Sequence, residues 1–191
     1  VGSNVSGTSD LAPLDQQAQM ILDLFPEAKT VAMLYCMGEP NSKYQVKVIT
    51  EILKDAGITV IDKAFTDSND VSVVAASAAS EADVIYVPTD NTAAGCAQTI
   101  GGVIGKTPLI AGEEGICSGC GVATLTINYY DLGVATGKMA AKILKGEANI
   151  SEMPIEYAAQ FTKKYNPEIC ADLGIDTAAL EAQGYIAIEL D

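Results

Sequence analysis

Residues 29–65 read KTVAMLYCMGEPNSKYQVKVITEILKDAGITVIDKAF, and this stretch decides the fold. Residues 29–35 form a continuous apolar run of the kind that is buried on both sides of a parallel sheet. Residues 42–56 place Val46, Ile49 and Leu53 on one helical face, and a glycine follows that stops the helix. Residues 58–65 return as a second strand. The order strand, helix, strand predicts a right-handed parallel crossover unit.

The same alternation of strands and helices continues on both sides of this unit. Further helices are expected at 14–25, 70–80, 92–104, 129–145 and 167–173, and further strands or extended segments at 83–87, 107–111, 122–127, 153–157 and 185–190. This pattern predicts an α/β fold: a doubly wound, mostly parallel sheet with helices on both faces. The glycines at 95, 101, 102 and 105 should make the 92–104 helix short, irregular or dependent on packing.

Composition excludes several classes of function. The 191 residues include 25 acidic side chains against 11 lysines and no arginine, which gives a net charge of -14. Such a charge opposes binding to nucleic acid and to anionic membrane surfaces. No apolar run approaches the length of a membrane-spanning helix. Histidine is absent, which removes the commonest general base, the usual nucleophile partner and the usual catalytic zinc ligand, so we expect a protein that is not an enzyme.

Polar side chains follow three of the predicted strands. Ligands of open parallel sheets bind beyond the carboxyl ends of the strands, so these loops are the candidate site. The loops read CMGEPNS at 36–42, PTDNT at 88–92 and GEEG at 112–115. Helix capping would explain any one of them, but three at one edge favour a binding site. The candidate residues here are Glu39, Asn41, Ser42, Asp90, Asn91, Thr92, Glu113 and Glu114.

No cofactor is predicted. The chain has neither a Walker-type phosphate loop nor a GxGxxG turn between a strand and a helix. Cys117 and Cys120 have CxxC spacing, but zinc would need two more ligands, and without histidine only the other three cysteines could supply them. The motif precedes a strand, whereas a thioredoxin-like site lies at a strand-to-helix junction. A local disulfide between Cys117 and Cys120 is the first expectation, and two unpaired thiols are the second.

Four motifs together resemble a known family. TSD at 8–10, GEPNS at 38–42, PTDNT at 88–92 and AGEEGICSGCGVAT at 111–124 are similar to the substrate-binding proteins of ABC importers of the tryptophan/tyrosine type. The resemblance implies the periplasmic-binding-protein type I fold, in which two flavodoxin-like lobes joined by a three-strand hinge enclose a small ligand, often an aromatic amino acid. Only the later part of that family's length is matched, and residues 95–105 depart from its pattern.

The resemblance also implies a division of the chain. Residues 1–10 correspond to the exit from a missing first lobe, 11–128 to the ligand-binding α/β lobe, 129–152 to a helix that packs on the first lobe, and 153–191 to the return to the second lobe. The 129–145 helix then lacks a core within this chain for its apolar stripe, which consists of Leu132, Ala135, Met139, Ile143 and Leu144. The stripe could be covered by the missing first lobe, by the chain's own sheet if the helix folds back, or by a second copy of the chain joined through residues 129–157. We expect the second copy.

A zwitterionic ligand would need partners for both of its charges. By resemblance, Asp90, Glu39 and Glu114 suit its ammonium group, and Ser9, Asn41, Ser42, Asn91 and Thr92 suit its carboxylate, with Asp10 and Glu113 in the same candidate set. Since the chain has no arginine, a guanidinium clamp on the carboxylate would come from the missing lobe.

The leading hypothesis is therefore the solute-binding component of an ABC importer, or one lobe of it. It would work with a transporter permease and lie outside the cytoplasm, with a lipoprotein anchor in its precursor. Because the sequence starts at Val1 without a signal segment, we expect a mature product or a fragment. The alternative is a flavodoxin-like redox or enzymatic module that uses Cys117 and Cys120. A receiver domain is disfavoured because no acidic pair ends the first strand.

Overall fold

The computed structural model describes residues 2–189. It divides into two compact units, one formed by Val1–Ala12 with Ile127–Thr162 and the other by Pro13–Thr126 with Lys163–Asp191. We call them the small unit and the large unit. The chain therefore leaves and re-enters the large unit near residues 12, 126 and 162.

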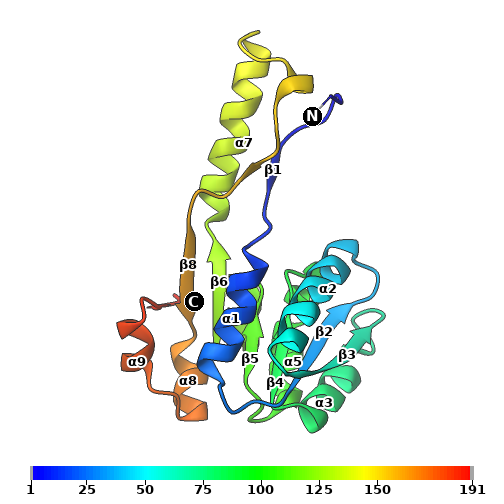
Figure 1. Ribbon diagram of the computed structural model, residues 1–191, viewed down its shortest axis with the longest axis vertical. Coiled ribbons are helices and arrows are strands. Elements are labelled where there is room, and N and C mark those ends of the chain that lie inside the picture. Colours follow the sequence, from blue (N-terminus) through cyan, green and yellow to red (C-terminus); the bar gives the residue numbers. More distant parts are fainter. Residues whose placement is uncertain (1, 190–191) are drawn as a thin grey trace. The chain divides into compact units, whose positions relative to one another are not determined.

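The large unit is built on a seven-stranded sheet with the order β3-β2-β4-β5-β6-β8-β9 (Figure 1). Its strands are β2 (Thr30–Cys36), β3 (Thr59–Phe65), β4 (Val84–Val87), β5 (Leu109–Ala111), β6 (Ala123–Ile127), β8 (Phe161–Tyr165) and β9 (Ile186–Ala187). β2 pairs in parallel with both β3 and β4, and the parallel pairing continues through β5 to β6. The predicted doubly wound, mostly parallel sheet is confirmed.

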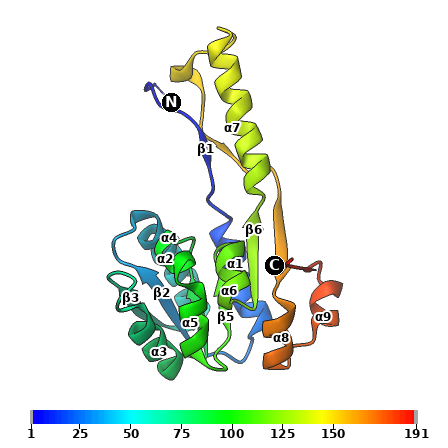
Figure 2. The same cartoon turned by 180° about the vertical axis from the view of Figure 1, so that it is seen from behind.

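Helices cover both faces of this sheet. They are α1 (Leu14–Leu24), α2 (Pro40–Asp55), α3 (Val71–Glu81), α4 (Asn91–Gly95), α5 (Ala97–Ile104), α6 (Glu114–Cys120), α8 (Pro167–Leu173) and α9 (Thr177–Ala182). α1 and α2 lie in front of the sheet in Figure 1, whereas α3, α5 and α6 lie on the face that Figure 2 turns toward the viewer. Because β2 is sandwiched, all of Val31–Cys36 is buried, as its unbroken apolar run predicts.

The glycine-rich segment forms two helices instead of one. α4 ends at Gly95 and α5 begins at Ala97, with Cys96 between them. Gly101 lets α5 approach α6 closely, because a Cβ there would lie 3.1 Å from both the Cβ of Cys120 and the carbonyl oxygen of Gly119. Packing therefore stabilises a stretch whose glycines disfavour an isolated helix.

The CxxC motif precedes the strand β6, as expected, but the expectation that it lies away from a strand-to-helix junction was wrong. Residues 114–120 form α6, which directly follows β5 and carries both Cys117 and Cys120. The seven-residue helix is too short and too rich in glycine to show helical periodicity in the sequence. The side chain of Glu113 starts it by accepting hydrogen bonds from the backbone N–H groups of Gly115 and Ile116.

The small unit consists of one long helix and short extended segments. Its elements are β1 (Thr8–Ser9), α7 (Tyr129–Leu144), the 3-10 turn η1 (Ile150–Glu152) and β7 (Glu156–Tyr157). β1 and β7 pair in parallel, and the Thr8 and Thr136 hydroxyl oxygens lie 2.7 Å apart, which joins β1 to α7. Within residues 2–189, no helix is both long and apolar enough to cross a bilayer.

Candidate functional site

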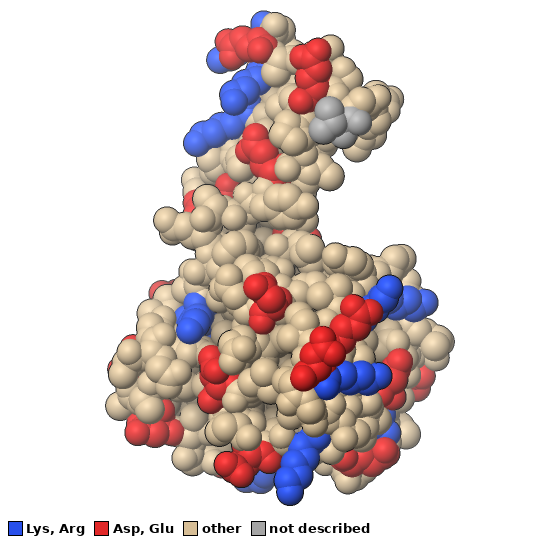
Figure 3. Space-filling model, in the orientation of Figure 1, with Lys and Arg blue, Asp and Glu red and all other residues tan. Residues whose placement is uncertain are grey.

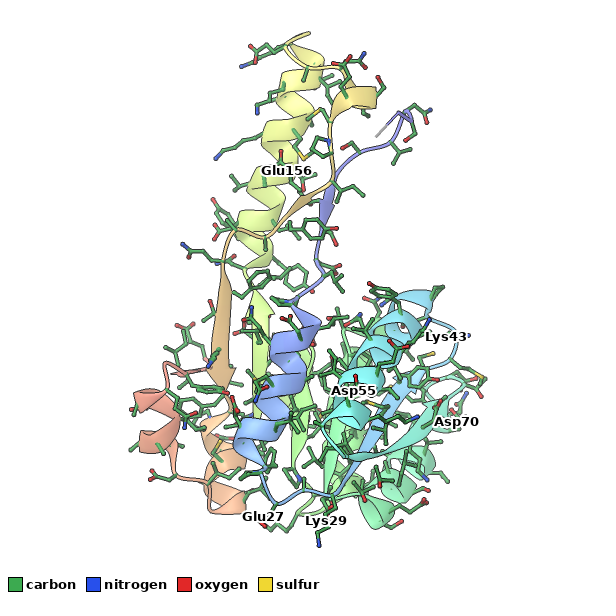
Figure 4. The ribbon with its side chains drawn as sticks, viewed as in Figure 1. Glu27, Lys29, Lys43, Asp55, Asp70 and Glu156 are labelled. Atoms are coloured by element: carbon green, nitrogen blue, oxygen red, sulfur yellow. The ribbon has the colours of Figure 1, made fainter. Side chains whose placement is uncertain are left out.

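Three polar loops follow β2, β4 and β5, which are neighbours in the sheet. Since these strands are parallel, their carboxyl ends lie at the same edge. The loops span residues 37–39, 88–90 and 112–113, and each leads into a helix. Figure 4 shows this edge beside Lys43, at the opposite end of the large unit from Glu27 and Lys29.

Asp90 is the buried centre of the polar cluster at this edge. Its side chain is 1% exposed. One carboxylate oxygen accepts hydrogen bonds from the Cys36 backbone N–H at 2.8 Å and from the Ser42 hydroxyl at 2.7 Å. The other accepts from the Ala93 backbone N–H at 2.8 Å. Asp90 thus ties the end of β2 and the start of α2 to the first turn of α4, and both of its oxygens are used.

Glu39 performs the same task from the adjacent loop. Its carboxylate accepts hydrogen bonds from the backbone N–H groups of Asn91 and Thr92 at 2.9 and 2.8 Å, and from the Thr92 hydroxyl at 2.7 Å. Burial acts to raise the pKa of Glu39, but these hydrogen bonds outweigh it and hold the pKa below its ordinary value. Glu39 is therefore ionised at neutral pH.

Two amide side chains of α2 hold the loop before α4. Asn41 donates to the Thr89 carbonyl at 2.8 Å. Gln45 donates to the same carbonyl at 3.2 Å and accepts from the Thr89 N–H at 3.1 Å. The sequence analysis missed Gln45, although its position one turn after Asn41 on the same face of α2 was a usable signal.

A second missed residue is Gln17 of α1. Its amide donates to the carbonyls of Gly112 and Leu125, both at 3.1 Å, and its oxygen accepts from the Tyr86 hydroxyl at 2.6 Å. Gln17 is 1% exposed, so this buried network of hydrogen bonds holds the loop after β5 in place. Gly112 is required there, because a Cβ would lie 2.5 Å from the backbone of Pro88 and Thr89.

The two glutamates after β5 differ in their partners. Glu113 caps α6 through N–H donors. Glu114 instead accepts from the ammonium group of Lys164 on β8, at 2.6 Å. The Glu114 and Lys164 side chains remain 37% and 24% exposed. The sequence analysis did not include Lys164, because nothing in the pattern places β8 beside this loop.

The structure brings six predicted residues into one hydrogen-bonded cluster, namely Glu39, Asn41, Ser42, Asp90, Asn91 and Thr92. Glu113 and Glu114 follow the neighbouring strand β5. Ser9 and Asp10 belong to the small unit, where the Ser9 hydroxyl accepts from the Leu11 N–H and Asp10 is exposed.

The structure has Cys117 and Cys120 as free thiols, and not as the disulfide that was the first expectation. Each thiol points to a separate carbonyl, of Gly121 and of Ile116. Burial raises the pKa of Cys117 well above its ordinary value and that of Cys120 to about 12. These thiols are mostly protonated at neutral pH, which opposes a thiolate-based redox role. In the described part of the chain, no three His, Cys, Asp or Glu side chains are grouped to hold a metal ion.

Comparison with known proteins gives a consistent family. The family model for the ABC transporter substrate binding protein matches residues 1–180. A tyrosine-binding protein of Clostridioides difficile (strain R20291) is 34% identical over 156 residues, which are 81% of this chain and 45% of that protein. This chain therefore spans about half the length of that curated relative.

Solved structures agree with this match. An ABC domain from Streptococcus pneumonia in complex with L-Trp is 33% identical with a TM-score of 0.89, over 98% of this chain and 66% of that one. The ligand-free, open structure of a Clostridium difficile substrate binding protein with adhesive properties is 34% identical with a TM-score of 0.78, over 100% and 64%. The motifs, the sheet order and these matches agree, and the chain belongs to the ABC transporter substrate binding protein family.

Proposed function

We propose that the large unit is the ligand-binding lobe of an ABC importer's solute-binding protein, and that it binds an amino acid with an aromatic side chain. The ligand would lie at the carboxyl ends of β2, β4 and β5. The observation that carries this proposal is the single polar cluster formed where these neighbouring strands end, with Asp90 at its centre. The relatives that contain L-Trp or are described as tyrosine-binding support the ligand class.

In this proposal, the buried groups position the exposed ones. Asp90, Ser42 and Gln45 are buried and hold the loops. Asn41 and Asn91 are exposed, so a ligand can reach them, although their amides also donate to the Thr89 carbonyl and the Glu39 carboxylate. A rigid set of loops loses little freedom on binding, which favours affinity. Ser9 and Asp10 lie in the small unit, and their role in ligand binding stays a prediction from the family resemblance.

The proposed partners follow from the family. We infer that the protein acts outside the cytoplasm, attached by a lipid anchor of its precursor, and delivers its ligand to a membrane permease. Figure 3 shows acidic side chains dispersed over the visible face, with a short row of lysines along α7. The net charge of -14 opposes binding to nucleic acid.

The small unit is proposed to pack against a first lobe in the intact protein. A groove of about 750 Å³ runs along α7. Leu132 and Met139 of the expected apolar stripe are already buried within the unit, but Val134 is 37% and Leu144 is 88% exposed. An isolated chain would cover these side chains through a second copy, using residues 129–157.

Titration calorimetry on the intact protein tests the ligand. We expect L-tryptophan or L-tyrosine to bind in preference to small or charged amino acids. Asn91→Ala should weaken binding about 10-fold, because a neutral hydrogen bond contributes about 0.5–1.5 kcal/mol. Asn69→Ala, in a loop after β3, is the matched control and should bind normally. Failure of all common amino acids to bind would contradict the proposed function.

A further inference from the structure

A free amino acid carries a negative carboxylate and a positive ammonium group on the same carbon atom. A site that recognises both charges needs a cation and an anion side by side. The chain has no arginine, so a cation supplied by the large unit must be a lysine. The following inference rests on the function proposed above and concerns the same site.

Most carboxylates of the proposed site are already used by N–H and O–H donors of the chain. Asp90 accepts from three donors, and Glu39 and Glu113 bind backbone N–H groups that begin α4 and α6. Each would have to give up such bonds in order to take a ligand ammonium. Glu114 differs, because its described partner is the ammonium group of Lys164.

The Lys164–Glu114 pair lies beside the loop that follows β5. Glu114 is the first residue of α6, and the carbonyl of Gly112 in the same loop accepts from the Thr89 hydroxyl at 3.3 Å. Glu114 is thus two residues along the chain from Gly112, which contacts the loop that carries Asp90. Both side chains are partly open to solvent, so a ligand can reach them.

Several other lysines of the large unit have different partners or places. Lys63 pairs with Glu81 at 2.6 Å, and Lys163 lies over the ring of Tyr185. Figure 4 shows Lys29 at the opposite end of the unit from the proposed site. Lys43 lies exposed near the site edge, on the first turn of α2, and is therefore the rival candidate.

We propose that Lys164 and Glu114 together bind the zwitterionic head of the ligand. The ligand carboxylate lies on the Lys164 ammonium group, and the ligand ammonium lies on the Glu114 carboxylate. Opening the existing pair costs little, because a partly exposed ion pair contributes little to stability. The four charges then alternate in sign, so the site neutralises itself around the ligand. The cation for the carboxylate thereby comes from this chain, without an arginine from elsewhere.

Calorimetry with L-tryptophan and its methyl ester isolates the role of Lys164. The ester keeps the ammonium group and lacks the negative carboxylate, so the wild type should prefer L-tryptophan. Lys164→Gln in the intact protein should weaken L-tryptophan binding about 10- to 100-fold. Binding of the ester should stay the same or tighten, because Glu114 loses its competing cation. Lys164→Arg should restore the preference, which separates charge from a folding defect.

Lys163→Gln and Lys43→Gln are the matched controls. The first changes the neighbouring residue and the second changes the rival lysine, and both should keep the wild-type preference for L-tryptophan over its ester. Glu114→Gln should produce the opposite pattern from Lys164→Gln. Glu114→Gln should weaken the binding of L-tryptophan. It should not weaken the binding of 3-indolepropionate, which lacks the ammonium group.

The outcomes distinguish this inference from the proposed function. If Lys164→Gln still prefers L-tryptophan over its methyl ester as strongly as the wild type does, the role of Lys164 is overturned. The amino-acid-binding function would then still stand. Loss of the preference in Lys43→Gln instead assigns the carboxylate to the rival lysine. If the wild type binds neither tryptophan nor any other amino acid, the function itself fails.

Discussion

Asp90 uses one buried carboxylate to join the end of β2, the start of α2 and the first turn of α4. Its oxygens satisfy two backbone N–H groups and the Ser42 hydroxyl. In Asp90→Asn, the amide NH2 would replace one oxygen and face donors where an acceptor is needed. We expect the free energy of unfolding to fall by about 1–3 kcal/mol.

Urea denaturation measures this loss directly. Asp55→Asn is the control, because Asp55 lies exposed at the last turn of α2 (Figure 4) and its replacement should change stability by less than about 0.5 kcal/mol. Equal stability of Asp90→Asn and the wild type would show that the buried carboxylate does not hold the loops together.

Thr124 presents the opposite case, a buried hydroxyl that costs stability. It is 0% exposed, and its oxygen is the buried side-chain atom without a hydrogen-bond partner in the described residues. Thr124→Val keeps the branched shape and removes the desolvated hydroxyl, so we expect a gain of about 1 kcal/mol. Thermal unfolding checks this, with Thr99→Val on the exposed side of α5 as the control. A lower melting temperature in Thr124→Val would mean that the hydroxyl has a partner, such as a bound water.

At the scale of elements, α4 depends on a carboxylate from another loop. Glu39 begins this five-residue helix from outside by binding the Asn91 and Thr92 N–H groups. Hydrogen bonding holds the pKa of Glu39 below its unfolded value. Its stabilisation is therefore complete above the unfolded pKa, near 4.3, and is lost as the pH falls through the folded pKa.

The prediction is a pH-dependent difference between wild type and Glu39→Gln. At pH 7 the variant should be less stable by about 1–2 kcal/mol, since a charge-assisted cap becomes a neutral one. The difference in the free energy of unfolding between the wild type and the variant should become smaller below about pH 4. Glu51→Gln, on the exposed face of α2, should show no such difference. A difference that stays constant from pH 7 to pH 3 would exclude ionisation of Glu39 as the cause.

The fold was largely predictable from the sequence because periodicity reports burial. The buried run of β2 and the amphipathic face of α2 follow from apolar spacing alone. Apolar spacing does not reveal short elements that depend on local hydrogen bonds. One example is α6, which begins where the Glu113 side chain caps it. Within the candidate site, residue types were readable from the loops, but partners such as Gln17 and Lys164 were not. Their roles arise from contacts between elements far apart in the sequence, separated by 95 residues for Gln17 and Gly112 and by 50 for Lys164 and Glu114.

At the scale of the molecule, exposed apolar side chains concentrate in the small unit. The exposed fraction is between 37% and 88% for five of them, namely Val5, Tyr130, Val134, Leu144 and Tyr157. Each large apolar side chain left in water forgoes about 1.5–3 kcal/mol of burial energy. Figure 3 shows lysines in a row along the α7 part of the surface.

The isolated 191-residue chain is therefore expected to self-associate through residues 129–157. Light scattering should detect a dimer of the wild type. Val134→Glu combined with Leu144→Glu should give a monomer, because both side chains are exposed on α7 and a charge there disfavours an apolar interface. Val73→Glu, on a helix of the large unit and 71% exposed, is the control and should leave the dimer intact. Adding the polypeptide of a first lobe should also break the dimer and give a one-to-one complex with that lobe, since the lobe competes for the same face. A wild-type chain that stays monomeric at its highest soluble concentration would show that the small unit does not need a cover.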